Sequence, residues 1–271
     1  MEQASFTKPL ALVTGASTGI GYELAKQFAE NGFDLVIAAE DSAIAEAATA
    51  IGAIGGAHVD YFQVDLSEID GPAKLYEFVT SLDRPLAAAA LNAGAGVGGD
   101  FTRETEIEDE IEIIHLNIRS TVILAKMVLK KMLEQGEGRV LFTSSVVGIL
   151  YAPLQAVYGG TKAFIQSFAE SIRNELKDTK ISITVLQPGA TETDFFDGPG
   201  LPETKVAQKK KDDPALVAKQ GFKALMAGDD HVVAGSFLNK VEVAIGKVLP
   251  ESAKAQVTRS YGEKVKPGKN A

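Results

Sequence analysis

Short apolar runs alternate with longer amphipathic stretches along most of this chain, and this rhythm constrains its fold more than any other feature. Such alternation is typical of a parallel sheet whose strands are joined by covering helices. The expected strands are Leu10–Thr14, Asp34–Ala38, His58–Val64, Leu86–Leu91, Arg139–Thr143, Ile181–Leu186 and His231–Ala234. The expected helices are Gly19–Asn31, Ser42–Ile54, Gly71–Leu82, Glu106–Glu134, Ala156–Lys177 and Pro214–Met226. The sequence therefore predicts an α/β protein.

The length of 271 residues and the hydrophobic content of 45 % fit one large domain better than two small ones. We assign residues 1–250 to this domain, with a substrate loop at about 190–213, and residues 251–271 to a C-terminal extension. So long a loop is usually functional. Its Phe195, Phe196 and Leu201 either contact an apolar substrate or pack the closed loop. The polar extension is expected to fray at its end.

The formal charge of −9 argues against an anionic macromolecule as a partner. Lys209 to Lys211 form the one cationic run, and they either begin a solvated helix or meet an acidic group on a substrate or carrier. We therefore expect no nucleic-acid partner and no membrane partner. No stretch approaches the roughly 18 apolar residues of a membrane span, and the N-terminus lacks a secretory pattern. A cytoplasmic protein is expected.

The chain contains no cysteine, which excludes disulfides, zinc–thiolate sites and thiol nucleophiles and is compatible with a reducing compartment. His58, His115 and His231 are scattered without the spacing of metal ligands. We expect no metal site.

A glycine-rich turn, "TGASTGIG", joins the first expected strand to the first expected helix. Gly15, Gly19 and Gly21 would allow a tight turn, close approach of the backbone to a pyrophosphate and close packing of helix on strand. The spacing is G-x-x-x-G-x-G, which departs from the generic dinucleotide fingerprint, so a purely structural turn stays open as an alternative.

Two carboxylates follow the second strand, where the adenosine ribose of a dinucleotide is expected. Glu40 could accept the ribose hydroxyls, but it would repel a 2′-phosphate by about 4 kcal/mol at about 4 Å and an effective dielectric near 20. No lysine or arginine lies between Lys26 and Lys74 to neutralise such a phosphate. This favours NAD over NADP. The alternative is that Glu40 and Asp41 cap the next helix.

Tyr158 and Lys162 lie four residues apart in "VYGGTKAF", so a helix would place them side by side. A neighbouring ammonium favours the phenolate and would lower the phenol's pKa from about 10 toward neutrality, which suits a general acid/base. The same spacing is common on solvated helices. We further interpret Gly159 and Gly160 as making room for substrate and cofactor beside Tyr158.

A second strand end supplies Ser144 and Ser145, 13 to 14 residues before the tyrosine. The carboxyl ends of the strands are where ligands bind in open α/β sheets. A pair of serines at a strand end is otherwise an ordinary turn or cap.

In combination, these motifs resemble the short-chain dehydrogenase/reductase family. The ordered set is "TGASTGIG", "LNAG" after the fourth strand, "SS" before "YGGTK", and "PGATET" after the sixth strand. The resemblance covers roughly residues 8 to 235 and leaves the loop at 195–213 and the tail without detailed counterparts. It implies a single-domain Rossmann fold, in which a doubly wound parallel seven-stranded sheet carries helices on both faces. It also implies hydride transfer between a nicotinamide cofactor and a carbonyl or secondary alcohol.

The resemblance further implies roles for individual residues. Tyr158 corresponds to the catalytic acid/base and Lys162 to the lysine that lowers its pKa and binds the nicotinamide ribose. Ser145 corresponds to the serine that holds the substrate carbonyl, and it is preferred to Ser144 because the family's serine usually lies 13 residues before the tyrosine. Asn117 corresponds to a helix asparagine that supports a proton-relay water.

The cofactor-binding set that the resemblance implies is Gly15, Ser17, Thr18, Gly19, Ile20, Gly21, Glu40, Asp65, Leu66, Asn92, Ala93, Gly94, Tyr158, Lys162, Pro188, Gly189, Thr191 and Thr193. Within it, Asp65 would contact the adenine amino group and Thr193 the carboxamide. Asn92 to Gly94 would steady the central sheet and pass the adenosine ribose. Leu91 departs from the asparagine usual before this segment.

Two other functions stay open at this point. The first is a catalytically silent nucleotide-binding or sensing protein on the same fold. The second is an epimerase or dehydratase of the extended relatives, which usually have another glycine rhythm and a longer C-terminal domain. The resemblance also implies a homodimer or homotetramer, paired through the helices at 106–134 and 156–177.

Overall fold

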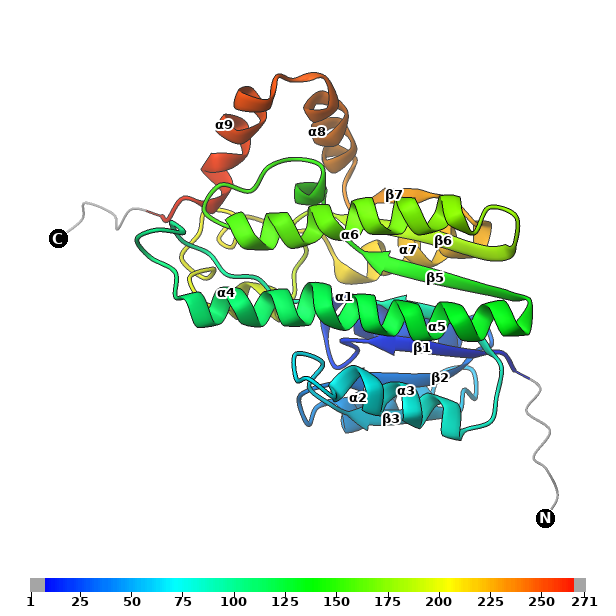
Figure 1. Cartoon of the computed structure of the whole chain (residues 1–271). Coiled ribbons are helices and arrows are strands. Elements are labelled where there is room, and N and C mark those ends of the chain that lie inside the picture. Colours follow the sequence, from blue (N-terminus) through cyan, green and yellow to red (C-terminus); the bar gives the residue numbers. More distant parts are fainter. Residues whose placement is uncertain (1–7, 266–271) are drawn as a thin grey trace, which may run out of the picture.

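The computed structural model describes residues 8–265, in which seven parallel strands form one sheet in the order β3-β2-β1-β4-β5-β6-β7 (Figure 1). The strands are β1 (Leu10–Thr14), β2 (Asp34–Ala39), β3 (Val59–Gln63), β4 (Leu86–Leu91), β5 (Glu137–Thr143), β6 (Lys180–Pro188) and β7 (His231–Ala234). The order reverses between β1 and β4, which is where ligands bind in a doubly wound sheet. The predicted fold class is confirmed.

Helices cover both faces of the sheet. They are α1 (Gly19–Glu30), α2 (Ile44–Gly52), α3 (Gly71–Ser81), α4 (Ile107–Ile114), α5 (Thr121–Gln135), α6 (Ala156–Glu175) and α7 (Pro214–Ala227). One hydrophobic cluster joins α1, α2 and α7 to the sheet, and a second joins α3, α5 and α6 to the opposite face. The central strands therefore have buried side chains on both sides, as is typical of parallel sheets, whereas the edge strand β3 is only partly buried.

The alanine-rich strand β4 shows why small side chains are tolerated there. Its Ala88 and Ala90 face the first cluster, whereas Ala89 and Leu91 face the second. All four are at most 4 % exposed. Burial in the centre of the sheet overrides the preference of alanine for helix.

The long helix expected at 106–134 is interrupted by a π-helix, His115–Ser120, between α4 and α5. A π-turn inserts an extra residue and frequently marks a functional site. The sequence analysis missed this interruption because hydrophobic spacing continues across it.

Two C-terminal helices were also missed, namely α8 (Phe237–Val248) and α9 (Glu251–Gly262). Figure 1 shows them as a hairpin that stands away from the sheet beyond β7. The tail was expected to be polar and to fray at its end. Its residues 251–262 are helical, and its end, residues 266–271, lies outside the described part of the chain. No helix within residues 8–265 is long and apolar enough to cross a membrane.

The two glycines beside Tyr158 have other surroundings than expected. A Cβ on Gly159 would lie 2.7 Å from the Cβ of Ala152, whereas Gly160 is exposed and would have no heavy atom within 4 Å of its Cβ. Gly159 thus allows the segment around Ala152 to pack against α6. The interpretation that this pair makes room for substrate and cofactor is wrong, because neither residue faces the cavity described below.

Candidate functional site

The glycine turn between β1 and α1 has a shape that larger residues would prevent. Gly15 and Gly19 have φ values of +65° and +59°, and a Cβ on Gly21 would lie 1.9 Å from the carbonyl oxygen of Gly15. Thr18, the N-cap of α1, makes no side-chain hydrogen bond to the helix. The first N–H groups of α1 are therefore free of a side-chain cap and suited to a phosphate group.

Asn92 ties three neighbouring strands together below this turn. Its Nδ2 donates to the Thr14 carbonyl oxygen at 3.1 Å, at the end of β1. Its Oδ1 accepts from the Thr143 hydroxyl at 3.0 Å, at the end of β5. Asn92 itself follows β4, so its side chain holds the carboxyl ends of β1, β4 and β5 in register.

Lys162 is buried and points from α6 toward the end of β5. Its ammonium nitrogen donates to the Thr143 carbonyl oxygen at 3.0 Å and lies 5.8 Å from the centre of the Tyr158 ring. A Cβ on Gly94 would lie 3.1 Å from this nitrogen, so a side chain at position 94 would crowd the ammonium.

The pKa of Tyr158 does not follow the expectation from its spacing to Lys162. Burial raises the pKa of Tyr158 to about 12, against a smaller lowering by the Ser145 hydroxyl. Burial also lowers the pKa of Lys162 to about 8. The expected shift of Tyr158 toward neutrality is therefore wrong for this structure, because burial disfavours the charged forms of both groups. Tyr158 is a neutral phenol at pH 7, which can donate a proton.

The two serines at the end of β5 have different surroundings. The Ser144 hydroxyl donates to the Lys162 carbonyl oxygen at 2.8 Å and is used in holding α6. The Ser145 hydroxyl donates to the Pro188 carbonyl oxygen and accepts from the Val147 N–H, both at the longer distance of 3.3 Å, and it interacts with Tyr158. Ser145 is thus the serine whose hydroxyl is available beside the tyrosine.

Asn117 lies in the π-helix, and its side chain joins two segments. Its Oδ1 accepts from the Ala95 N–H at 3.0 Å, and its Nδ2 donates to the Ala95 carbonyl at 2.9 Å and to the Thr161 hydroxyl at 3.0 Å. These bonds fix the chain after β4 against α6. Because the side chain is engaged in this way, contact with a relay water would fall to main-chain groups of the π-helix.

A cavity of about 470 Å³ joins the glycine turn to Ser145, Tyr158 and Lys162. A second cavity of about 590 Å³ adjoins it at Thr18 and Gly94 and extends to Glu40 and Leu66. Together they are lined by every residue of the expected cofactor set except Asp65. Asp65 instead accepts hydrogen bonds from the N–H and hydroxyl of Ser67, both at 2.7 Å.

At the acidic end of the second cavity, Glu40 and Asp41 have different surroundings. Asp41 accepts from the Ala43 N–H at 2.9 Å and from the Ser17 hydroxyl at 2.6 Å, so it orders the chain before α2. Burial, followed by repulsion from Asp65, Asp41 and Glu112, raises the pKa of Glu40. Glu40 thus lines a cavity wall that is already rich in negative charge.

The substrate loop lines the cavity and is held by the C-terminal segment. The Phe195 ring lies 5.1 Å from the Tyr158 ring, centre to centre. The N–H of Lys205 donates to the Glu263 carbonyl at 2.8 Å, and the side chains of these two residues form an ion pair of 2.7 Å. Leu201 is fully buried and packs the loop itself.

The lysine run does not begin a helix, because α7 starts at Pro214 with Asp213 as its N-cap. Lys211 pairs with Glu192 at 3.1 Å, and Lys209 lies over the Tyr261 ring at 5.4 Å. The reading as a solvated helix start is therefore wrong.

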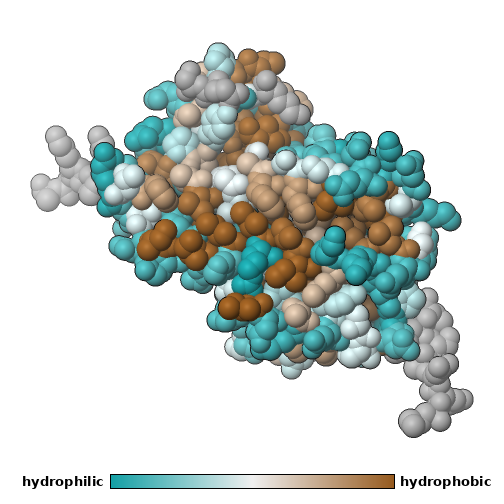
Figure 2. Space-filling view, in the orientation of Figure 1, coloured by the Kyte–Doolittle hydropathy of each residue, from teal (hydrophilic) through white to brown (hydrophobic). Residues whose placement is uncertain are grey.

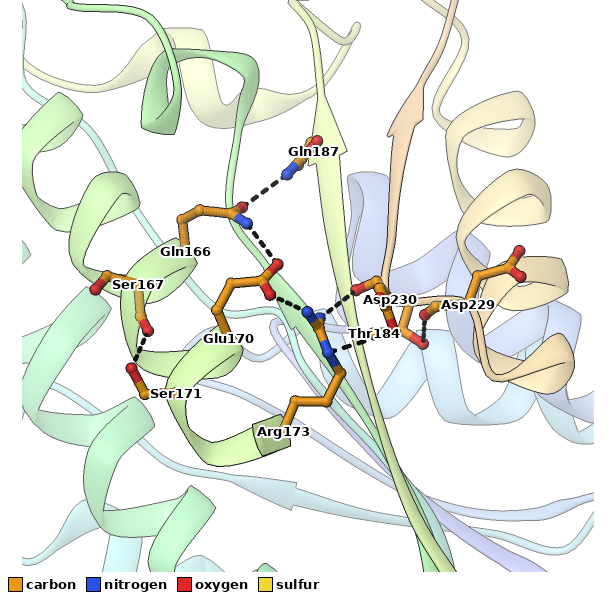
Figure 3. Close-up of polar contacts among 9 residues, drawn as sticks. All are labelled: Gln166, Ser167, Glu170, Ser171, Arg173, Thr184, Gln187, Asp229 and Asp230. Atoms are coloured by element: carbon orange, nitrogen blue, oxygen red, sulfur yellow. Dashed lines mark hydrogen bonds and ion pairs between the residues drawn. The ribbon is translucent and has the colours of Figure 1, made fainter. Parts of the chain in front are cut away.

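A network of polar side chains fixes the carboxyl end of β6, which ends at Pro188 (Figure 3). Gln187 donates to Gln166 at 2.7 Å, and Gln166 donates to Glu170 at 3.1 Å. Glu170 pairs with Arg173, which also reaches Asp230 at 3.3 Å, just before β7. This network ties α6, β6 and β7 together beneath the cavity. The Oε1 of Gln187 is buried without a hydrogen-bond partner.

Sequence reasoning missed the cavity residues that the C-terminal hairpin supplies. They are Ser236, Leu238, Asn239, Glu242 and Tyr261. The helical spacing of apolar residues in "FLNKVEVAIGKV" could have revealed α8. No local sequence pattern marks Tyr261 as a cavity residue.

The comparisons with known proteins agree with this geometry. Residues 9–200 match the family model described as short chain dehydrogenase. The oxidoreductase asL5 of Sarocladium schorii is 32 % identical over 189 residues, which cover 70 % of this chain and 74 % of that protein. The chain therefore belongs to the short-chain dehydrogenase family of oxidoreductases, as the sequence motifs predicted.

Two solved structures show the same fold with different cofactors. A short-chain dehydrogenase from Sphingobium yanoikuyae in complex with NADPH has a TM-score of 0.77 at 25 % identity, over 90 % of this chain and 97 % of that one. A short-chain dehydrogenase/reductase from Burkholderia phymatum in complex with NAD has a TM-score of 0.80 at 20 % identity, over 98 % of this chain and 100 % of that one.

Burial of the Lys162 ammonium should lower the free energy of unfolding at neutral pH. With a folded pKa of about 8 and an ordinary value of 10.5, burial opposes folding fully below pH 8, and this effect disappears as the pH rises to 10.5. The pKa shift corresponds to about 3 kcal/mol of lost stability at neutral pH. Removing the lysine would restore this free energy but would also lose the hydrogen bond to Thr143, which is worth about 1 kcal/mol. Lys162→Met should therefore stabilise the protein by about 2 kcal/mol at pH 6.5, as measured by urea unfolding.

The gain should shrink between pH 8 and pH 10.5. Lys177→Met, which alters an exposed lysine shortly after the end of α6, is the matched control and should change stability little. A Lys162→Met protein that is less stable than the parent at pH 6.5 would contradict this account.

Proposed function

We propose that this protein catalyses hydride transfer between a nicotinamide cofactor and a carbonyl or secondary-alcohol substrate. The observation that carries the proposal is that Ser145, Tyr158 and Lys162 line the same cavity as the glycine turn. The glycine cradle and the adjoining cavity at Glu40 together suit an extended dinucleotide. A bound reduced nicotinamide would supply the hydride, which no side chain of this site can provide.

The protein's own residues would act on the carbonyl oxygen. The Tyr158 phenol is neutral at pH 7 and would donate its proton to the developing alkoxide, while the Ser145 hydroxyl would hold the same oxygen by a hydrogen bond. Lys162 would bind the cofactor ribose and place a positive charge near the oxygen. In alcohol oxidation the same residue would act in reverse, with the phenolate of Tyr158 accepting the alcohol proton.

The wall of the cavity suggests an apolar substrate. Phe195, Phe196, Val206 and Leu238 line the same cavity as Ser145 and Tyr158. Apolar side chains beside a polar anchor are typical of sites for small organic molecules. We infer an apolar ketone or secondary alcohol.

We also infer that the chain forms a homodimer or homotetramer in the cytoplasm. Figure 2 shows a hydrophobic band over the face formed by α4, α5 and α6. Ile107, Ile111 and Phe164 contribute exposed apolar side chains to these helices. Large exposed apolar patches mark contacts between proteins.

The alternative function is nucleotide binding without catalysis. It would explain the glycine turn and the cavity at Glu40 but gives no role to the convergence of Ser145, Tyr158 and Lys162. Turnover separates the two functions.

Removal of the Tyr158 hydroxyl should lower kcat by at least about 100-fold, since the proton donor is lost. The measurement is NADH consumption with a panel of apolar ketones of graded size, for the parent and for Tyr158→Phe. Tyr61→Phe, which removes a hydroxyl from an exposed tyrosine on β3, is the control and should retain activity. Unchanged turnover in Tyr158→Phe would refute the mechanism, and absence of turnover by the parent with every ketone would favour the silent alternative.

The carboxylates around the second cavity should make the protein prefer NADH over NADPH. Glu40→Gln removes the charge nearest the ribose site and should lower KM for NADPH by about tenfold, which corresponds to about 1.4 kcal/mol, with little effect on NADH. Glu46→Gln, on the exposed side of α2, is the matched control. A parent protein that prefers NADPH would contradict the role assigned to Glu40.

A further inference from the structure

Helix α8 is anchored on the protein by its polar and small residues. Asn239 donates to the Ala234 carbonyl at 2.8 Å and to the Asp212 carboxylate at 2.7 Å. Val243 is buried, and a Cβ on Gly246 would lie 2.0 Å from Leu150. Residues 239, 243 and 246 recur at helical spacing, so they define the face of α8 that contacts the protein.

The opposite face of α8 is apolar and turned to solvent. Its exposed fractions are 75 % for Phe237, 68 % for Leu238, 52 % for Ile245 and 82 % for Val248. Val241 and Ala244 complete the same face. Surface helices normally direct their apolar residues inward, so this arrangement is reversed. Together these six residues form what we call the α8 apolar face.

The segment that carries this face is positively charged. Residues 237–271 contain seven lysine or arginine residues and three glutamates, a net charge of +4, whereas the whole chain has −9. The first 236 residues therefore carry −13. Lys240 is exposed and lies beside the α8 apolar face, about one turn from Phe237. The expectation of no membrane partner rested on the total charge. The total charge does not reveal that the C-terminal segment is positive and the rest of the chain negative.

We propose that the α8 apolar face docks on an anionic lipid surface. An apolar helix face with flanking cations is the arrangement of helices that lie in the plane of a membrane interface, where apolar side chains enter the acyl boundary and lysines meet anionic headgroups. A second copy of this chain fits less well, because two positively charged hairpins would be brought together. No spanning segment is needed for such docking.

Docking would place the catalytic cavity beside the lipid. Leu238, Asn239 and Glu242 of α8 line that cavity, as do apolar residues of the substrate loop. An apolar substrate dissolved in the bilayer would then reach the cavity along α8. Lipid binding itself does not depend on the proposed function, so the two can fail separately.

The test is co-sedimentation of the full chain with vesicles of phosphatidylcholine alone and of phosphatidylcholine with about 30 % phosphatidylserine. We expect binding to the anionic vesicles, at least about tenfold weaker binding to the neutral ones, and a strong reduction in about 0.5 M salt. Absence of binding to anionic vesicles, or equal binding to both kinds, overturns the proposal.

The double variant Phe237→Ser, Val248→Ser should lose binding to anionic vesicles by at least about tenfold. Both side chains are exposed and outside the cavity lining, so turnover in solution should be retained and would show that the protein is folded. Ile69→Ser is the matched control, because Ile69 is 84 % exposed far along the chain from α8. Retained vesicle binding in the double variant overturns the proposal. A double variant that changes its oligomeric state, while its lipid binding does not change, overturns it as well.

Discussion

The hydrogen bond from the buried Lys162 ammonium to the Thr143 carbonyl connects the sheet to α6, and the candidate site is arranged around it. A side chain at Gly94 would crowd this ammonium, and Asn117 holds the neighbouring segment at Ala95. Burial opposes the positive charge, as the lowered pKa of Lys162 shows. A group retained under such an unfavourable effect is better explained by function than by stability.

Much of the fold could be predicted because the sheet is buried on both faces. The seven apolar runs leave little choice of position, and even the alanine-rich strand β4 has the expected bounds. The cavity around the glycine turn followed from local requirements at Gly15, Gly19 and Gly21, where positive φ or close approach excludes other residues. These features depend on residues that are close together in the sequence, so they could be predicted from it.

Other features depend on contacts between distant segments and could not be predicted in this way. The raised pKa of Tyr158 results from burial beneath Phe195 and the substrate loop, which the spacing to Lys162 does not reveal. Asp65 and Asp41 proved to be engaged by neighbouring residues, and the contribution of Tyr261 to the cavity depends on a hairpin whose second helix is mostly polar. The backbone pairing of the loop at 203–206 with residues 261–265 is likewise a tertiary contact.

The central claim is that this site transfers hydride to a carbonyl carbon. It is tested most directly by incubating the protein with an apolar ketone and NADH that carries deuterium at both C4 positions, followed by nuclear magnetic resonance of the product. The account predicts one deuterium on the carbinol carbon of the alcohol and a hydroxyl proton drawn from solvent. An alcohol without deuterium, or cofactor that stays unoxidised with every ketone tried, would contradict it.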